Sequence, residues 1–228
     1  IIFFALTFSV KAQFTIGYSV GYGTYSMGEM KDGLKSLAKL YTKTGEYLFD
    51  MAVVENFPGY INHQLEAGYR LNHHEFGIKS MYRTTGGKVS RADYSGEVSR
   101  KLTMNGFKQE LFYRYYFLNQ DEDFNFYLDV APGIIFNNLK AESDINLSVY
   151  DETLEYSETI KFNGINFAVT SSVGVSYNIT SMIMLRLAAG YEINFTDANL
   201  KKNSHEWIYG NSNWSGLRIS AGISLYFK

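Results

Sequence analysis

The chain has 228 residues, a length that one β-barrel or sandwich can use alone, so a single folded domain is expected. Its 21 Lys and Arg residues against 23 Asp and Glu residues give a net charge of −2, which excludes a strongly basic nucleic-acid-binding surface. The absence of cysteine excludes disulfide scaffolds, thiolate zinc sites and cysteine nucleophiles. The 19 Tyr, 17 Phe and 20 Gly residues favour a β protein, since aromatic residues prefer strands and glycine marks turns.

The first segment, residues 1–12, is predicted to be the remnant of a signal peptide. Eight of its first ten residues are apolar, a run too short to cross a bilayer as a helix but typical of a secretory signal. Val10 and Ala12 stand where the signal peptidase prefers small side chains, which predicts cleavage next to Gln13. The alternative is a buried N-terminal strand. Residues 13–228 are predicted to form one barrel domain.

From Phe14 onward, apolar and polar residues alternate in eight segments. In the last of them Leu217, Ile219 and Ile223 alternate with polar residues, so one face of the strand is apolar and the other is polar or small. The predicted strands are 14–23, 60–71, 75–85, 102–117, 124–136, 163–177, 183–195 and 216–228.

The connections between these segments are alternately long and short, with 36, 3, 16, 6, 26, 5 and 20 residues. Outer-membrane barrels have this arrangement, with an even number of strands, short periplasmic turns and longer extracellular loops. The sequence therefore predicts an all-β fold, an eight-stranded antiparallel up-and-down transmembrane β-barrel with long extracellular loops and short periplasmic turns.

The chain resembles the small outer-membrane β-barrel proteins of Gram-negative bacteria, such as the transmembrane domain of outer membrane protein A. The resemblance rests on the signal that ends in Lys11-Ala12-Gln13, the eight alternating strands and the last six residues, 223–228. These six residues are similar to the C-terminal assembly signal of the family, although Lys228 follows the aromatic Phe227. The resemblance implies residence in the outer membrane and recognition by the barrel-insertion machinery, while function varies within the family.

The polar face of each strand is predicted to line the barrel. A base at mid-bilayer on the lipid face costs about 2–4 kcal/mol, whereas inside the barrel acids and bases can form ion pairs. An eight-stranded barrel is just wide enough for side chains to fill. A closed lumen with an ion-pair network is therefore expected, and no motif supports use of its carboxylates in catalysis. The predicted network consists of Glu66, Arg70, Lys79, Arg83, Lys108, Glu110, Arg114, Asp129, Arg186, Glu192 and Arg218.

Two short motifs have weak functional interpretations. His73 and His74 lie in the shortest connection and lack a third ligand nearby, so a solvated turn is expected in place of a metal site. Residues 17–21 match the G-x-S-x-G pattern of hydrolases but lack the helix that should follow the serine. The sequence predicts no metal and no cofactor.

Three polar residues, His63, Ser80 and Gln109, are expected on the lipid-facing side of neighbouring strands. Two bacterial enzymes that modify lipid A are also eight-stranded barrels, and the lipid A deacylase has His and Ser on its outer wall. Ser80 is expected opposite about Glu66, one or more positions away from His63, and no suitable acid shares this face. A lipid A-modifying hydrolase is therefore an alternative, with a narrow channel as another.

Two of the long connections have internal patterns. In residues 24–59, apolar residues spaced by three and four predict a short amphipathic helix that caps the barrel mouth, lies on the outer leaflet or meets a protein partner. The residues of this pattern are Met27, Met30, Leu34, Leu37, Leu40 and Tyr41. Residues 137–162 are expected to continue two strands beyond the membrane as a hairpin, with acidic residues on a solvated face.

The resulting hypothesis is a non-enzymatic outer-membrane barrel with a structural or surface-interaction role. Its expected partners are outer-membrane lipid and lipopolysaccharide, the barrel-insertion machinery during assembly, and an extracellular protein that contacts the loops. Nucleic acid is not expected as a partner.

Overall fold

The computed structural model describes residues 12–43, 52–94, 96–119, 122–149, 152–196, 198, 200–202, 205–206 and 211–227. The predicted signal segment lies outside these residues except for Ala12, which begins the first strand. No helix in these ranges has the length and apolar character that crossing a membrane requires.

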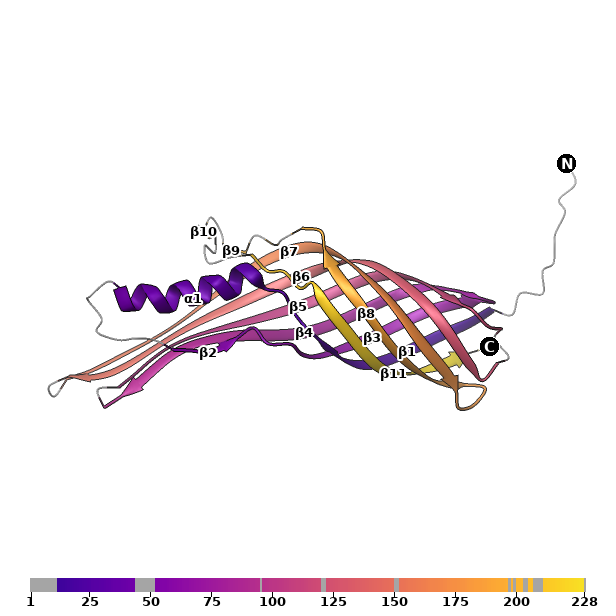
Figure 1. Cartoon of the computed structure of the whole chain (residues 1–228), viewed down its shortest axis with the longest axis horizontal. Coiled ribbons are helices and arrows are strands. Elements are labelled where there is room, and N and C mark those ends of the chain that lie inside the picture. Colours follow the sequence, from indigo (N-terminus) through magenta and orange to yellow (C-terminus); the bar gives the residue numbers. More distant parts are fainter. Residues whose placement is uncertain are drawn as a thin grey trace, which may run out of the picture.

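Eight antiparallel strands in the described chain close into a barrel (Figure 1). Each strand pairs with the next one in the ring, and the last strand closes the ring against the first, with Phe14 opposite Phe227. The strands are β1 (Ala12–Gly23), β3 (Tyr60–Leu71), β4 (His74–Asp93), β5 (Gly96–Tyr116), β6 (Phe124–Val149), β7 (Glu152–Asn178), β8 (Ile183–Asn194) and β11 (Gly216–Phe227).

The remaining described elements lie at one end of the barrel, where β4 to β7 extend beyond the other strands (Figure 1). We call this the extended end, and the opposite end, with the turns after β3, β5 and β7, the short-turn end. The helix α1 (Gly28–Lys43) follows β1, and β2 (Ala52–Asn56) pairs with the extended part of β4. Two short strands, β9 (Lys201–Lys202) and β10 (His205–Glu206), pair with each other.

The predicted loop at residues 86–101 is wrong, because β4 and β5 stay paired as far as Asp93 and Gly96. The outer face of this segment carries Lys88 and Ser90, so the apolar pattern of a lipid-facing strand stops while the strand continues. The predicted hairpin in residues 137–162 is confirmed, since β6 and β7 remain paired as far as Val149 and Glu152.

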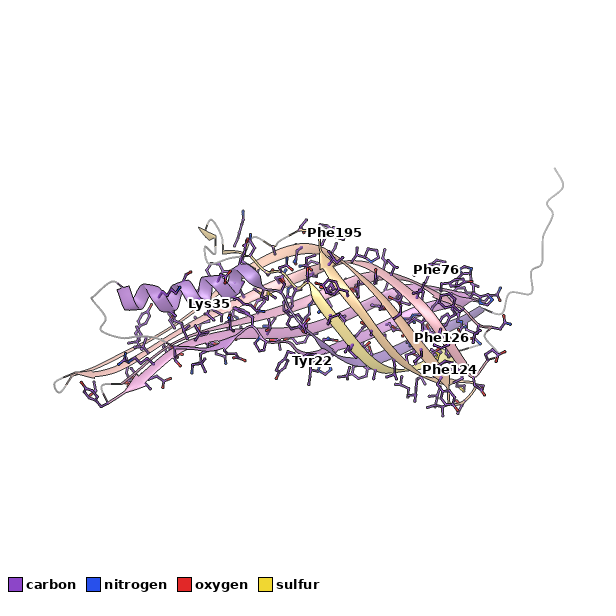
Figure 2. The ribbon with its side chains drawn as sticks, in the orientation of Figure 1. Tyr22, Lys35, Phe76, Phe124, Phe126 and Phe195 are labelled. Atoms are coloured by element: carbon purple, nitrogen blue, oxygen red, sulfur yellow. The ribbon has the colours of Figure 1, made fainter. Side chains whose placement is uncertain are left out.

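The outer wall of the barrel is apolar and ends in two aromatic girdles. Figure 2 shows Phe76, Phe124 and Phe126 at the short-turn end and Tyr22 and Phe195 at the other end of the barrel wall. The girdle at the short-turn end contains Phe14, Tyr69, Phe76, Tyr113, Phe124, Phe126, Tyr177 and Phe227, and the girdle toward the extended end contains Tyr22, Tyr60, Tyr82, Phe107, Phe136, Phe167 and Phe195. All of these side chains are exposed.

The spacing of the girdles matches a membrane. Phe14 and Tyr22 are at the two ends of the outward face of β1. A strand rise near 3.3 Å and a tilt of about 40° place these two residues roughly 20 Å apart along the barrel axis. This is close to the apolar band of about 25 Å found on outer-membrane barrels. Exposed Ile16, Leu111 and Leu187 lie between the girdles and continue the apolar wall.

Candidate functional site

The interior of the barrel contains all eleven residues of the predicted ion-pair network. Alternation along each strand turns these side chains inward, and each of the eleven residues is at most 7% exposed. Ten of them form two groups, one toward the short-turn end around Arg114 and one toward the extended end around Glu192, while Arg70 stacks on a tyrosine near the short-turn end.

The first group, which we call the Arg114 cluster, contains Arg114, Glu66, Glu75, Asp129, Lys79 and Arg186. The Arg114 guanidinium donates to Glu66 at 3.1 and 3.2 Å, to Glu75 at 2.9 Å and to Asp129 at 3.1 Å. Lys79 lies 2.6 Å from Asp129, and Arg186 pairs with Glu66. Three carboxylates therefore surround one guanidinium, and two further bases, Lys79 and Arg186, each contact one of these carboxylates.

Glu75 belongs to this cluster but is absent from the sequence-based prediction. It is fully buried and accepts hydrogen bonds from Thr15 at 2.6 Å and from Tyr116 at 2.8 Å. Glu75 shares the inward face of β4 with Lys79 and Arg83, so continuing the same alternation by four residues from Lys79 toward the turn identifies it.

The second group, which we call the Glu192 cluster, contains Glu192, Arg83, Lys108, Arg218 and Glu110. Arg83 donates to both oxygens of Glu192 at 2.9 Å, a bidentate arrangement that fixes both side chains. Lys108 lies 3.1 Å from Glu192 and 2.5 Å from Glu110, and Arg218 lies 3.4 Å from Glu192. Three bases thus share one central carboxylate.

Buried tyrosines lie in the lumen near the short-turn end. Arg70 stacks on the Tyr116 ring, with 3.7 Å between the guanidinium carbon and the ring centroid, and its Nη1 lies 3.4 Å from the Tyr226 hydroxyl. Tyr116 and Tyr127 are 5.6 Å apart between ring centroids. Gly174 leaves room for the Tyr127 ring, because a side chain at this position would overlap the ring.

The extended end of the lumen is covered by Trp214. Its indole is fully buried, stacks 4.4 Å from the Arg83 guanidinium and donates to Asn137 at 2.6 Å. The ring edge contacts Tyr25, with 4.9 Å between the two ring centroids. Burial raises the pKa of Tyr25, so its hydroxyl stays protonated and donates to the carbonyl of Tyr60 at 3.3 Å.

The predicted amphipathic helix is confirmed as α1 and packs beside Trp214. Met27, Met30 and Leu34 are fully buried, while the side chains of Leu37, Leu40 and Tyr41 lie outside the described part of the chain. The helix joins an apolar cluster on the inner face of the extended strands, which we call the cap core. Its members are Tyr25, Met27, Met30, Leu34, Ala38, Phe57, Val89, Leu102, Met104, Ile135, Leu139, Phe162, Ala168, Leu200 and Trp214.

On the outer wall, the three predicted polar residues form two separate pairs. Ser80 lies opposite Gln109, and hydrogen bonds of 2.8 and 3.0 Å join their side chains. His63 Nδ1 lies 2.8 Å from the Tyr18 hydroxyl. The expected partner of Ser80 is a residue near Glu66, and the observed partner is one residue away.

Ser80 pairs with Leu65, because Leu71 pairs with His74 and only two residues form the turn. The lipid-facing serine is therefore bonded to an amide, not to the histidine. This arrangement lacks the serine–histidine contact of an activated nucleophile.

The two histidines of the short turn contact tyrosines of β5. His73 Nδ1 lies 2.9 Å from the carbonyl of Tyr116, and His74 Nδ1 lies 2.8 Å from the Tyr113 hydroxyl. Ser19, the serine of the hydrolase-like pattern, lies within β1. In the part of the chain that the structure describes, no three His, Asp or Glu residues gather as metal ligands would.

A closed ring of eight antiparallel strands, an apolar outer wall between aromatic girdles and a polar, filled interior define a small outer-membrane β-barrel protein. Barrels of the Gram-negative outer membrane have this architecture.

No protein-family model and no curated protein sequence matches the chain. Among solved structures, Neisserial surface protein A is similar over 95% of this chain and 97% of that chain, at 16% identity and a TM-score of 0.40. Ail of Yersinia pestis is similar over 95% and 97%, at 10% identity and a TM-score of 0.36. The Escherichia coli outer membrane protease OmpT is similar over 97% and 99%, at 9% identity and a TM-score of 0.42.

Proposed function

We propose that the protein is a non-enzymatic outer-membrane barrel with a structural and surface-interaction role, and that it acts through the strands that extend beyond the membrane. This proposal rests on one observation. The strands β4 to β7 continue beyond the other strands as a paired sheet (Figure 1). This part of the sheet lies past the aromatic girdle and has its own buried cap core. A sheet supported in this way presents a fixed outer face above the lipid. Short turns of such barrels are periplasmic, so the extended end faces the outside of the cell.

The outer face of the extended sheet carries two cross-strand pairs of lysines, which we call the lysine pairs. Lys88 lies opposite Lys101, and Lys140 lies opposite Lys161. Like charges directly opposite each other destabilise a sheet. Two neighbouring acids compensate the four lysines only in part. Glu142 lies opposite Lys101 and 2.5 Å from Lys140, and Glu97 lies 3.9 Å from Lys88.

The position of the lysine pairs fits the polar layer of the outer leaflet. On β6, Lys140 follows the girdle residue Phe136 by four positions. This spacing corresponds to roughly 10 Å along the barrel axis, and a lysine side chain can extend back toward the interface. Lysine binds phosphate groups as a point charge. Lipopolysaccharide, through its phosphate groups, is therefore the partner that the charge and height of this face favour.

The closed lumen argues against the channel alternative. Both charged clusters are buried, and Trp214 covers the extended end of the lumen. An eight-stranded barrel leaves space only for side chains or one small ligand. We expect no steady conductance in planar bilayers, and discrete conductance steps of the wild-type protein would favour a channel.

The outer wall offers a weak basis for the hydrolase alternative, because Ser80 is bonded to Gln109 and His63 to Tyr18. We expect lipid A from cells with and without the protein to have the same acyl chains by mass spectrometry. Loss of an acyl chain that depends on both His63 and Ser80 would favour the enzyme.

The surface role is tested by lipopolysaccharide binding in detergent. The double substitution Lys101→Gln and Lys161→Gln should weaken binding about 30-fold, since each lysine near an anionic surface contributes about 1 kcal/mol. Lys35→Gln, on the exposed side of α1, is the matched control (Figure 2). Equal affinity of the double variant and the control would contradict the proposal, as would equal binding of dephosphorylated lipopolysaccharide. A protein partner at the cell surface, sought by pull-down from intact outer membranes, is expected to contact the hairpin tips.

A further inference from the structure

We propose that the lumen binds a small inorganic anion, chloride, in the cavity between the Arg114 cluster and the Glu192 cluster. This site is independent of the proposed surface role. The cavity has a volume of about 50 Å³ and is lined by residues of both clusters. That volume exceeds the 10–15 Å³ that one water molecule needs, so a monatomic anion fits with room for water.

The charge around the cavity favours an anion. The charged residues of the lining are four bases, Lys79, Arg114, Arg186 and Arg218, and two acids, Glu66 and Glu110. The described lumen as a whole shows the same excess, since the seven predicted bases face the four predicted acids and Glu75. Each of the four lining bases already pairs with a carboxylate of the network, but the described lumen keeps an excess of two positive charges. Buried excess charge is strongly unfavourable, and a bound anion reduces it without any change in the protein.

Two buried guanidinium groups on the cavity wall have unused donors. Nη1 of Arg186 and Nε of Arg218 have no hydrogen-bond partner within the described ranges. Arg186 is 7% exposed and Arg218 is 6% exposed. A buried donor without a partner is costly, and the cost is greater for a charged group. An anion accepts hydrogen bonds from such donors and also balances their charge, whereas water accepts the hydrogen bonds without balancing the charge.

The rest of the wall explains why space remains there. The lining residues of β1, β7, β8 and β11 are mostly small, and they include Ser19, Ser172, Gly190, Ser220 and Gly222. Hydroxyl groups of serine donate to halide ions as well as to water. The long bases come from the strands opposite and from β8 and β11. The cavity therefore combines donors of two kinds, charged guanidinium groups and serine hydroxyl groups.

The first test is diffraction from crystals grown in sodium bromide, measured at the bromine absorption edge. We expect an anomalous peak inside the cavity, within hydrogen-bond distance of Arg186 or Arg218. Peaks confined to surface lysines, or a cavity that holds only water, would overturn the proposal. This measurement uses the wild-type protein, so it does not depend on the folding of any variant.

The second test compares thermal unfolding in detergent with chloride and with gluconate at the same ionic strength. Chloride should raise the unfolding midpoint by about 2–4 °C, because a ligand that binds only the folded state stabilises it. Ser172→Val fills part of the cavity and should abolish this dependence. Ser171→Val, on the exposed face of the same strand, should retain it. Equal midpoints in the two salts for the wild-type protein would overturn the proposal.

Discussion

The Arg114 guanidinium donates to the Glu75 carboxylate at 2.9 Å, and the two residues lie directly opposite each other on β5 and β4. Glu75 also accepts hydrogen bonds from Thr15 on β1 and from Tyr116 at the end of β5. One buried carboxylate thus connects three strands near the short-turn end. This end of the lumen depends on a residue that lies next to the two-residue turn between β3 and β4.

Glu75→Gln should lower the unfolding midpoint in detergent strongly. Removing one partner of a buried ion pair costs about 3–5 kcal/mol, because the other charge stays buried without compensation. Glu155→Gln, in the exposed hairpin of β6 and β7, should change stability by no more than about 0.5 kcal/mol. Equal effects of the two substitutions in thermal or urea unfolding would mean that Glu75 does not take part in the buried network.

Arg114→Leu tests which face of β5 lines the lumen. In the structure Arg114 contacts three carboxylates, so its loss should destabilise the barrel by several kcal/mol. Leu111→Arg is the complementary change on the exposed face, where a base facing lipid costs about 2–4 kcal/mol. Stabilisation by Arg114→Leu, measured by unfolding in lipid vesicles, would place β5 one residue out of register.

Leu34→Ala should loosen α1 from the cap core. The side chain is fully buried, and truncation of such a leucine costs about 2–5 kcal/mol. The barrel below the girdle does not contain this residue, so heat-modifiable migration on gels should persist while protease cleavage within residues 28–43 becomes faster. Lys35→Ala, one position further along the helix and exposed, should leave the cleavage rate unchanged (Figure 2). A cleavage rate equal to that of the wild-type protein in Leu34→Ala would contradict the capping role.

Membrane topology can be tested with single cysteines, because the chain has none of its own. Tyr94→Cys, at the exposed tip of the β4–β5 hairpin, should react with an impermeant maleimide on intact cells. Asn119→Cys, in the turn between β5 and β6, should react only after the outer membrane is permeabilised. The opposite pattern would invert the barrel in the membrane.

The sequence predicted the strands inside the membrane well because the barrel makes every second residue face lipid, and that alternation is visible in residues such as Leu217, Ile219 and Ile223. The extended parts of β4 and β5 were missed because their outer face meets water and carries Lys88 and Ser90. Their inner face is covered by α1 and Trp214, which come from distant parts of the chain. The local sequence pattern of β4 and β5 gives no sign of contacts with segments so far away in the chain.

The lumen residues follow from the same alternation, but their partners do not. The shear of the barrel decides that Arg83 meets Glu192 on a distant strand and that Lys79 meets Asp129. The length of the turn also sets the pairing of β3 with β4. The turn has only two residues, and this places Ser80 opposite Leu65. Register and shear are properties of the closed ring, so they appear only when all eight strands are placed.

The claim that this protein is a closed outer-membrane barrel is tested most directly by electrophoresis of the detergent-extracted protein with and without boiling. A closed barrel keeps its strand pairs in detergent, so the unheated sample should migrate as a compact band that shifts to the position of the unfolded chain after boiling. A protein that remains soluble without detergent and migrates identically before and after boiling would contradict the account.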